Sequence, residues 1–250
     1  MQLTVRRVTG IGGIRMLTDY LALDLETTGL YPERDRIIEI GAVKYKNGVE
    51  TERFSCFVKI CKKLPEKIIE LTGITDEMLS DGFDEKTALT EFLKFAGGVR
   101  VLLGHNIGFD FSFLKVAAAR FGMEFEGEAL DTLQFAKKLH PELASRTLSA
   151  LCAHYKIVQE RAHRAVDDAV SAHRLYQALA AAIPEYDFLP QPLFYQPKKQ
   201  EPMTLRQKKY LNNLLRCHGM EYTEEMDSLS KSDASRMIDR LIFTKGRLQT

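Results

Sequence analysis

The chain has 250 residues, which is enough for one large domain or for a medium-sized domain with a small module. Its hydrophobic content of 45% and charged content of 28% are ordinary for a globular protein, and a net charge of +1 does not mark a general polyanion binder. No apolar run reaches transmembrane length, and the four cysteines lack metal-ligand spacing. We therefore expect a cytoplasmic protein without a membrane partner.

The first strong pattern follows an N-terminal extension, residues 1–18, which lacks the apolar segment of a signal peptide. Residues 20–29 alternate like a strand, with three leucines on one face and Asp24 and Glu26 on the other. Two carboxylates this close on a central strand repel each other, and burying them without a partner is costly. A divalent metal ion is the strongest candidate for that partner.

The next segments predict a mixed α/β sheet. Residues 36–45 and 50–60 read as strands joined by an Asn47-Gly48 hairpin, which makes the first half of the sheet antiparallel. After them, short apolar strands alternate with helical segments. The expected strands are 99–103 and 129–130, and the expected helices are 65–71, 84–95, 109–121, 132–140, 147–155 and 165–182.

The C-terminal quarter differs in composition. Residues 184–202 hold five of the eight prolines and predict a linker, and residues 203–250 predict a small helical module. Within the module, Ser232 is the expected N-cap of a second helix. From residue 198 onward there are 11 basic and 7 acidic residues. The inward-facing side chains of its first helix are expected to be Leu205, Leu211, Leu214 and Leu215.

Two further motifs carry polar side chains at helix starts. Gly104 to Asp110 follows a buried strand, and there an aspartate alone is well explained by the helix dipole. The preceding glycine and asparagine, however, suit close approach to a phosphate. In the second motif His163 lies on a loop and Asp168 in the first turn of a long helix. A loop histidine alone is usually solvated, but its spacing from an aspartate gives it more weight.

Together the motifs offer four carboxylates, from Asp24, Glu26, Asp110 and Asp168, and one neutral base, His163. Hard oxygen ligands without thiolates select Mg²⁺ or Mn²⁺, and four carboxylates exceed the needs of one ion. Two ions would use them, in the arrangement that supports phosphodiester hydrolysis. His163 would then accept the proton of the attacking water.

In this order the motifs Asp-x-Glu-Thr-Thr-Gly-Leu, Gly-His-Asn-x-x-Phe-Asp and His-x-Ala-x-x-Asp resemble those of the DEDD exonucleases of the histidine subclass, which are similar to proofreading subunits. The segment Leu71 to Thr75 is also similar to one in that family. The resemblance covers about residues 19–182 and implies an exonuclease domain at 19–183. It also implies a ribonuclease H-like fold with a five-stranded mixed sheet flanked by helices.

The resemblance also implies roles for individual residues. Asp24 would bridge two metal ions, Glu26 and Asp168 would hold the ion that activates water, Asp110 would support the other, and His163 would be the general base. Contacts to the terminal nucleotide are expected from Thr27, Thr28, Gly29, Leu30, His105, Asn106 and Phe109.

Other acidic residues have simpler explanations. Glu39 is a candidate supporting partner of the site, Asp131 is expected to cap a helix, and Asp167 is expected to be solvated. In the predicted linker, Gln191 to Phe194 is weakly similar to sliding-clamp-binding peptides.

The expected function is 3′–5′ exonucleolytic hydrolysis of nucleic acid with a free 3′ end, single-stranded DNA being favoured, in replication proofreading or repair. A DNA polymerase or a sliding clamp is a candidate partner. RNA 3′-end trimming and a non-catalytic nucleic-acid or polymerase tether are the alternatives.

Overall fold

The computed structural model describes residues 16–160, 163–183, 186–197, 201–223, 226–227 and 229–246. The chain divides into two compact units, Met1–Gln196 and Pro197–Thr250. No helix in the described part of the chain is long and apolar enough to cross a membrane. Most of the expected N-terminal extension, residues 1–15, lies outside the described residues.

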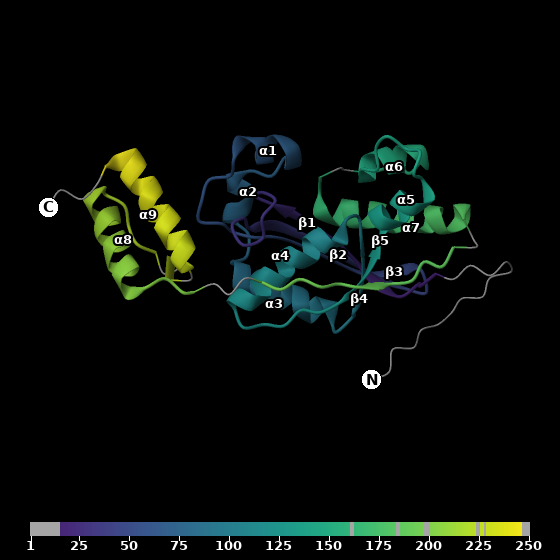
Figure 1. The fold of residues 1–250 in the computed structure, drawn as a ribbon, viewed down its shortest axis with the longest axis horizontal. Coiled ribbons are helices and arrows are strands. Elements are labelled where there is room, and N and C mark those ends of the chain that lie inside the picture. The colour runs from purple at the N-terminus through teal and green to yellow at the C-terminus, as the bar shows by residue number, and fades with distance from the viewer. Residues whose placement is uncertain are drawn as a thin grey trace. The chain divides into compact units, whose positions relative to one another are not determined.

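A single mixed sheet forms the centre of the first unit (Figure 1). Within the described residues its strand order is β3-β2-β1-β4-β5-β6, so β1 lies in the interior as its apolar face predicted. β1, β2 and β3 are antiparallel, β4 and β5 run parallel to β1, and β6 is antiparallel to β5. The strands are β1 Tyr20–Thr27, β2 Ile37–Lys46, β3 Val49–Phe57, β4 Val101–Gly104, β5 Glu128–Asp131 and β6 Gln191–Pro192.

The hairpin between β2 and β3 forms where it was expected. Asn47 and Gly48 both have positive φ, 53° and 74°, as the favoured two-residue hairpin turn requires. Between and after the strands lie the helices α1 Glu66–Thr72, α2 Asp76–Ser80, α3 Glu85–Ala96, α4 Ile107–Arg120, α5 Thr132–Leu139, α6 Leu148–His154 and α7 Ala165–Ala182.

β1 contributes to two hydrophobic cores, one on each face of the sheet. Leu21, Leu23 and Leu25 are buried with side chains of α3 and α4. Tyr20 and Ala22 are buried on the opposite face with side chains of α5, α6 and α7. The strand is therefore covered on both sides, and any charged side chain on it must find its partners within the protein.

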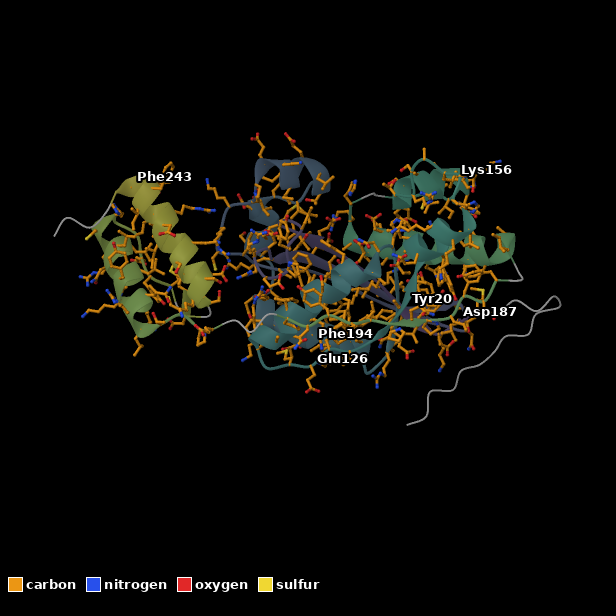
Figure 2. All side chains as sticks on the ribbon, in the orientation of Figure 1. Tyr20, Glu126, Lys156, Asp187, Phe194 and Phe243 are labelled. Atoms are coloured by element: carbon orange, nitrogen blue, oxygen red, sulfur yellow. The ribbon has the colours of Figure 1, made fainter. Side chains whose placement is uncertain are left out.

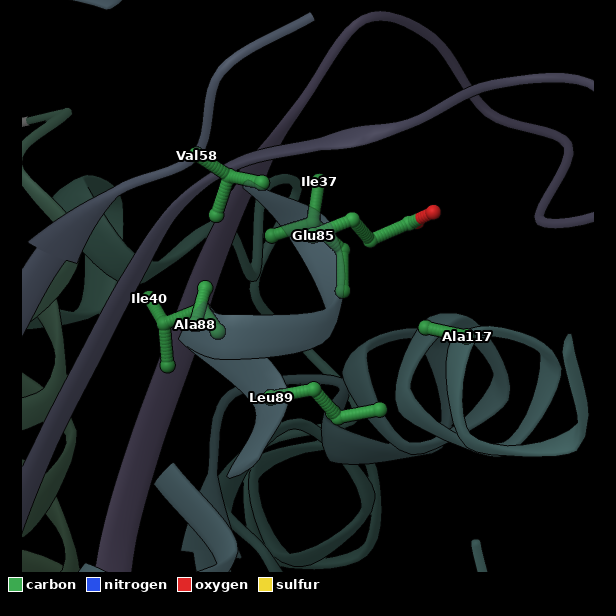
Figure 3. Close-up of a pocket in the computed structure, with 7 residues that line it drawn as sticks. All are labelled: Ile37, Ile40, Val58, Glu85, Ala88, Leu89 and Ala117. Atoms are coloured by element: carbon green, nitrogen blue, oxygen red, sulfur yellow. The ribbon is translucent and has the colours of Figure 1, made fainter. Parts of the chain in front are cut away.

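Figure 3 shows an apolar contact between β2, α3 and α4. The carboxyl group of Glu85 turns away from these apolar side chains and pairs with Arg120 of α4 at 2.5 Å. The apolar contact and the Glu85–Arg120 pair together hold α4, which carries Asp110, against α3. The apolar residues involved are Ile37, Ile40, Val58, Ala88, Leu89 and Ala117.

The sheet has six strands rather than the expected five, because the segment predicted as a linker supplies β6. Gln191 pairs with Ala129 and Pro192 with Glu128. Phe188 is fully buried, and Leu193 packs against the core on the α3 and α4 side. Only the end of the expected linker leaves the first unit, since the second begins at Pro197.

The second unit contains α8 Leu205–Cys217 and α9 Lys231–Lys245. Leu205 was predicted to face inward but is 86% exposed; it precedes Leu211 by six residues, which turns it by about 240° to the outer side. The N-cap of α9 is Ser230, whose side chain accepts from the Asp233 N–H, and not Ser232 as predicted. Exposed aromatic side chains include Phe194 in the first unit and Phe243 in α9 (Figure 2).

Candidate active site

The carboxyl end of β1 holds the first two acidic side chains. Asp24 and Glu26 lie on the face of β1 that α7 covers, because they alternate with the buried leucines. In the register with β2, Asp24 lies opposite Gly41 and Glu26 opposite Glu39. Asp24 and Glu26 therefore face the N-terminal end of α7.

Gly41 allows the start of α7 to lie directly on the sheet. A Cβ atom at this position would lie 2.1 Å from the backbone nitrogen of Val166 and 2.2 Å from the carbonyl carbon of Ala165. Ala165 itself is fully buried. The close approach brings the first turn of α7, with Asp168, to the carboxylates of β1.

His163 lies in the loop before α7, and Asp168 lies in the first turn of that helix. The backbone N–H of His163 donates to the Asp168 carboxylate at 2.9 Å, and the Gln159 side chain donates to it at 3.3 Å. His163 has a φ of 63°, and its side chain is exposed. Ligand atoms of Glu26, His163 and Asp168 all lie within 4.8 Å of one another.

Asp110 reaches the same place from the other face of the sheet. It lies in the first turn of α4, is buried, and accepts a hydrogen bond of 2.9 Å from the backbone N–H of Leu25. Its charge acts on Asp24, whose pKa it helps to raise. The structure therefore brings carboxylates from β1, α4 and α7 to one end of the sheet.

Burial and mutual repulsion dominate the electrostatics of this cluster. Burial raises the pKa of Asp24 well above its usual range, and the charges of Asp110 and Asp168 raise it further. Burial also raises the pKa of Asp110. For Glu26, burial and the Asp168 charge raise the pKa to about 7. For both β1 carboxylates burial is the largest cause of the raised pKa, and the neighbouring negative charges add to it.

These residues fit a divalent cation. Their donors are mainly carboxylate oxygens, which are the ligands that a hard ion prefers. A cation among them would remove the repulsion that raises their pKa values. Glu26 and Asp168 lie within ligand distance of a common point, and Asp24 and Asp110 are electrostatically coupled beside them.

Arg164 is a residue whose part in the site the sequence patterns did not reveal. Its guanidinium donates to both carboxylate oxygens of Glu39, with Nη2 to Oε1 at 2.9 Å, and Glu39 has no exposed surface. Glu39 also accepts from the backbone N–H of Ala165 at 3.2 Å. The pair ties β2 to the loop that carries His163, and the Arg164 charge lowers the pKa of Glu26.

Two local signals could have identified this ion pair. Glu39 interrupts an apolar strand, so its carboxylate needs a cation once the strand is buried. Arg164 is adjacent to the motif histidine.

Asp167, which was predicted to be solvated, is buried in the first turn of α7. Asp131 caps α5 as predicted, by accepting from the Leu133 N–H.

The loop after β1 forms a compact turn. The Thr27 hydroxyl donates to the Gly29 carbonyl at 2.7 Å, and the Thr28 hydroxyl accepts from the Arg36 N–H at 3.0 Å. A Cβ on Gly29 would come within 2.5 Å of the Asp35 carboxylate. Leu30, by contrast, is 74% exposed. The turn thus holds its polar groups internally and presents an apolar side chain to the solvent.

The three residues at the start of α4 differ in accessibility. Both ring nitrogens of His105 are engaged, with the Thr132 hydroxyl and the Arg146 carbonyl at 2.9 Å each, so these nitrogens have partners within the protein. Asn106 has a φ of 67° and an exposed side chain. Phe109 is half-buried and packs against the ring of Phe113.

Comparisons with known proteins agree with this geometry. DNA polymerase III PolC-type from Clostridium perfringens is 40% identical over 151 residues, which are 60% of this chain and 10% of the polymerase. The Bacillus subtilis protein of the same name is 38% identical over 167 residues, 65% of this chain and 12% of its own length. The chain therefore spans only a small part of the curated relatives it matches.

Among solved structures, E. coli exonuclease I in complex with a dA16 oligonucleotide has a TM-score of 0.60 at 19% identity, covering 67% of this chain and 42% of that one. Exonuclease X in complex with 5′ overhanging duplex DNA has a TM-score of 0.52 at 22% identity, covering 65% of this chain and 92% of that one. These likenesses show a shared fold.

A sequence model of the exonuclease family, RNase T, matches residues 21–176, which contain β1, the start of α4 and the start of α7. This match includes all three acidic motifs and agrees with the resemblance to DEDD exonucleases. The chain belongs to the exonuclease family.

Proposed function

We propose that the protein is a metal-dependent 3′–5′ exonuclease that removes nucleotides one at a time from single-stranded DNA. The observation that carries the proposal is the meeting of four carboxylates and an exposed histidine at one end of the sheet. Solved structures with the same fold hold DNA oligonucleotides, which supports DNA as the substrate.

The metal site of this proposal uses two Mg²⁺ or Mn²⁺ ions. Asp24, Glu26, Asp110 and Asp168 would hold these ions. Ions bound there would stabilise the charge that develops on the phosphoryl oxygens and lower the pKa of a bound water. The raised pKa values of Asp24, Glu26 and Asp110 support this assignment, because a bound cation would stabilise the charged form of these carboxylates.

In the proposed mechanism His163 is the general base. Its exposed imidazole accepts a proton from the water that attacks the terminal phosphorus. A new bond forms between phosphorus and the water oxygen, and the bond to the 3′ oxygen of the preceding nucleotide breaks. That oxygen takes up a proton, and a 5′-mononucleotide is released. The hydrogen bond from the His163 N–H to Asp168 and the Glu39–Arg164 pair hold the loop in place.

The terminal nucleotide would be held by the loop after β1 and the start of α4. Exposed Leu30 suits an apolar contact with a base, and Asn106 presents an exposed amide. Phe109 and the turn from Thr27 to Gly29 complete the proposed contacts. We exclude His105 from this set, because its ring nitrogens already have partners within the protein.

We further propose a role beside a DNA polymerase, in proofreading or repair, which places the protein in the cytoplasm. The similarity to PolC-type polymerases supports this setting. A sliding clamp is a less supported partner. The segment similar to clamp-binding peptides is held in the fold of the first unit, because Gln191 and Pro192 pair with β5 and Leu193 packs on the core.

The test is digestion of 5′-labelled single-stranded DNA in Mg²⁺ and in Mn²⁺. We expect a ladder of products that shorten from the 3′ end, lost in chelator and in Asp24→Asn. Asp84→Asn is the matched control, because it neutralises an exposed carboxylate at the N-cap of α3 and should leave the ladder intact. Activity that persists in Asp24→Asn, or a preference for a matched RNA strand, would contradict the proposal.

A further inference from the structure

The second unit forms a core of its own, which the exonuclease family does not explain, since the family match ends at residue 176. Leu211, Leu214 and Leu215 of α8 are buried against Ile238 and Leu241 of α9. The two helices run in the same direction, because contacts join both their beginnings and their ends. These contacts are Gln207 Nε2 to the Lys231 carbonyl, and His218 to the Gly246 carbonyl.

The outer face of α8 carries a basic stripe. We define this stripe as Arg206, Lys209, Asn213 and Arg216, all of which are exposed. Their spacing of three, four and three residues places them along one side of the helix, opposite the buried leucines. α8 contains no acidic residue. The stripe therefore presents positive charge without an acidic neighbour on its own helix.

Three other basic side chains of this unit have acidic partners. The ion pairs are Lys208–Asp227 at 2.6 Å, Lys231–Glu201 at 2.6 Å and Arg236–Asp233 at 2.7 Å. Among the described residues no ion pair involves the three cations of the basic stripe. These three pairs neutralise charge away from the stripe, so the stripe itself stays positive.

The net positive charge of the chain is concentrated in the second unit. Residues from 198 onward include 11 basic and 7 acidic side chains, which leaves 24 basic and 27 acidic side chains in the rest of the chain. The unit that holds the carboxylate cluster therefore has a net charge of −3 and does not attract a polyanion by its overall charge. A substrate that is a polyanion would gain affinity from the unit with a charge of +4.

We propose that the basic stripe of α8 is a second binding site for single-stranded DNA, in which Arg206, Lys209 and Arg216 contact successive phosphates. The choice of DNA rests on the proposed function; the binding itself does not depend on hydrolysis. From its first to its last residue the stripe extends over about 15 Å, which is long enough to follow several phosphates of one strand. The exposed amide of Asn213, between the cations, can donate to a phosphate or a base.

The experiment measures binding of the full chain to a fluorescent single-stranded DNA by anisotropy, in EDTA, at several salt concentrations. We expect Arg206→Gln/Lys209→Gln/Arg216→Gln to raise Kd about tenfold at low salt and to reduce the salt slope by about 2, the value for three lost phosphate contacts. The matched control, Lys46→Gln/Lys94→Gln/Arg100→Gln, removes three exposed cations from the first unit and should leave the slope unchanged.

A charge-conserving variant separates loss of charge from loss of folding. Arg206→Lys/Lys209→Arg/Arg216→Lys should bind like the unmodified chain, and the melting temperatures of all variants should agree, since the changed side chains are exposed and glutamine is a good helix former. An unchanged salt slope in the glutamine variant would overturn the proposal. The proposal would also be overturned if the glutamine variant lost affinity for an RNA strand but kept its affinity for DNA.

The use of EDTA keeps this result independent of the proposed activity. If the chain binds DNA through the stripe but does not shorten it in Mg²⁺, the proposed function fails and the second binding site stands. If it shortens DNA and the glutamine variant of the stripe binds DNA as well as the glutamine control of the first unit, the second binding site fails and the proposed function stands.

Discussion

At the scale of single residues, the carboxylate cluster is organised for a cation and is costly without one. Glu26 shows the cost most directly, because burial, Asp168 and Glu39 together raise its pKa from 4.5 to about 7. In the folded, metal-free protein this side chain binds a proton over a pH range in which the unfolded chain has released it. The site therefore opposes folding at neutral pH and depends on metal to offset that cost.

The first prediction follows from the sign of this shift. Because the folded-state pKa of Glu26 is raised, the metal-free protein should lose stability as pH rises from about 4.5 to about 7, on the order of 2 kcal/mol from this group. Glu26→Gln should flatten this pH dependence and raise the melting temperature in EDTA at pH 7. Thermal unfolding from pH 4.5 to 8 is the measurement.

Glu66→Gln, which neutralises an exposed carboxylate in the first turn of α1, is the control for this experiment and should retain the full pH dependence. Adding Mg²⁺ should stabilise the unmodified protein more than Glu26→Gln. Identical pH dependence in the two variants would show that Glu26 is not the titrating group.

The second prediction concerns the Glu39–Arg164 pair. Arg164→Lys keeps the charge but loses the fork that contacts both oxygens of Glu39, so the loop that carries His163 should be held less firmly. We expect kcat to fall about tenfold with little change in KM for an oligonucleotide, since only the alignment of the base is affected. Steady-state kinetics and a pH profile of kcat are the measurements.

Arg53→Lys is the matched control, because Arg53 makes a comparable two-oxygen contact with Glu50 on the exposed strand β3. This variant should keep kcat. If Arg164→Lys kept kcat as well, Arg164 would have only a structural part, and a fall in melting temperature without a fall in kcat would indicate the same.

At the scale of elements, the approach of α7 to the sheet decides whether the site assembles. The start of this helix lies on Gly41, and only a residue without a side chain fits there. The third prediction is that Gly41→Ala destabilises the fold by about 3 kcal/mol, because the clash is with backbone atoms that cannot turn aside. Urea unfolding in EDTA is the measurement, and DNA hydrolysis in Mg²⁺ should fall with it.

Gly108→Ala is the control for Gly41→Ala, because alanine is expected to fit at position 108 without a clash. Gly108 lies in α4 with a negative φ, and a Cβ there would meet nothing within 4 Å. Alanine should therefore stabilise the protein by about 0.5 kcal/mol by reducing the freedom of the unfolded chain. Equal effects of the two substitutions would refute the packing argument at Gly41.

The elements that could be predicted from the sequence are those with a strong local signal. β1 alternates over its whole length, and the Asn47-Gly48 turn defines its own hairpin. β6 was missed because two residues in a proline-rich segment carry no periodicity, and they pair with β5 across more than sixty positions of the chain. The N-cap of α9 was predicted at Ser232 and is Ser230, because element boundaries depend on backbone geometry that residue type alone does not fix.

The same distinction applies to the site. The carboxylates and His163 stand in short motifs whose spacing is visible along the chain, and the structure brings those motifs together. The Glu39–Arg164 pair joins residues 125 positions apart, and its geometry depends on how α7 lies on β2. Sequence alone indicates that Glu39 needs a cation but does not say which one.

At the scale of the whole molecule, the segment after α7 decides where the first unit ends. Phe188 is fully buried and makes ring contacts with Phe135, Tyr176 and Tyr186. Further along, the Tyr195 hydroxyl donates to the Glu33 carboxylate in the loop after β1. The chain from 188 to 195 is therefore part of the exonuclease fold and supports the loop that presents Leu30.

The fourth prediction compares two truncated chains on this basis. A chain that ends at Gln196 should keep the melting temperature of the first unit and its kcat at saturating DNA, since every contact described above is retained. A chain that ends at Asp187 loses Phe188, β6 and the Tyr195 hydrogen bond, and should be less stable by about 4 kcal/mol, the usual cost of removing a buried phenylalanine. If any activity survives in the shorter chain, KM for the oligonucleotide should rise more than kcat falls, because the lost hydrogen bond supports the loop that would contact the terminal base. Equal melting temperatures for the two chains would mean that residues 188–195 only connect the two units.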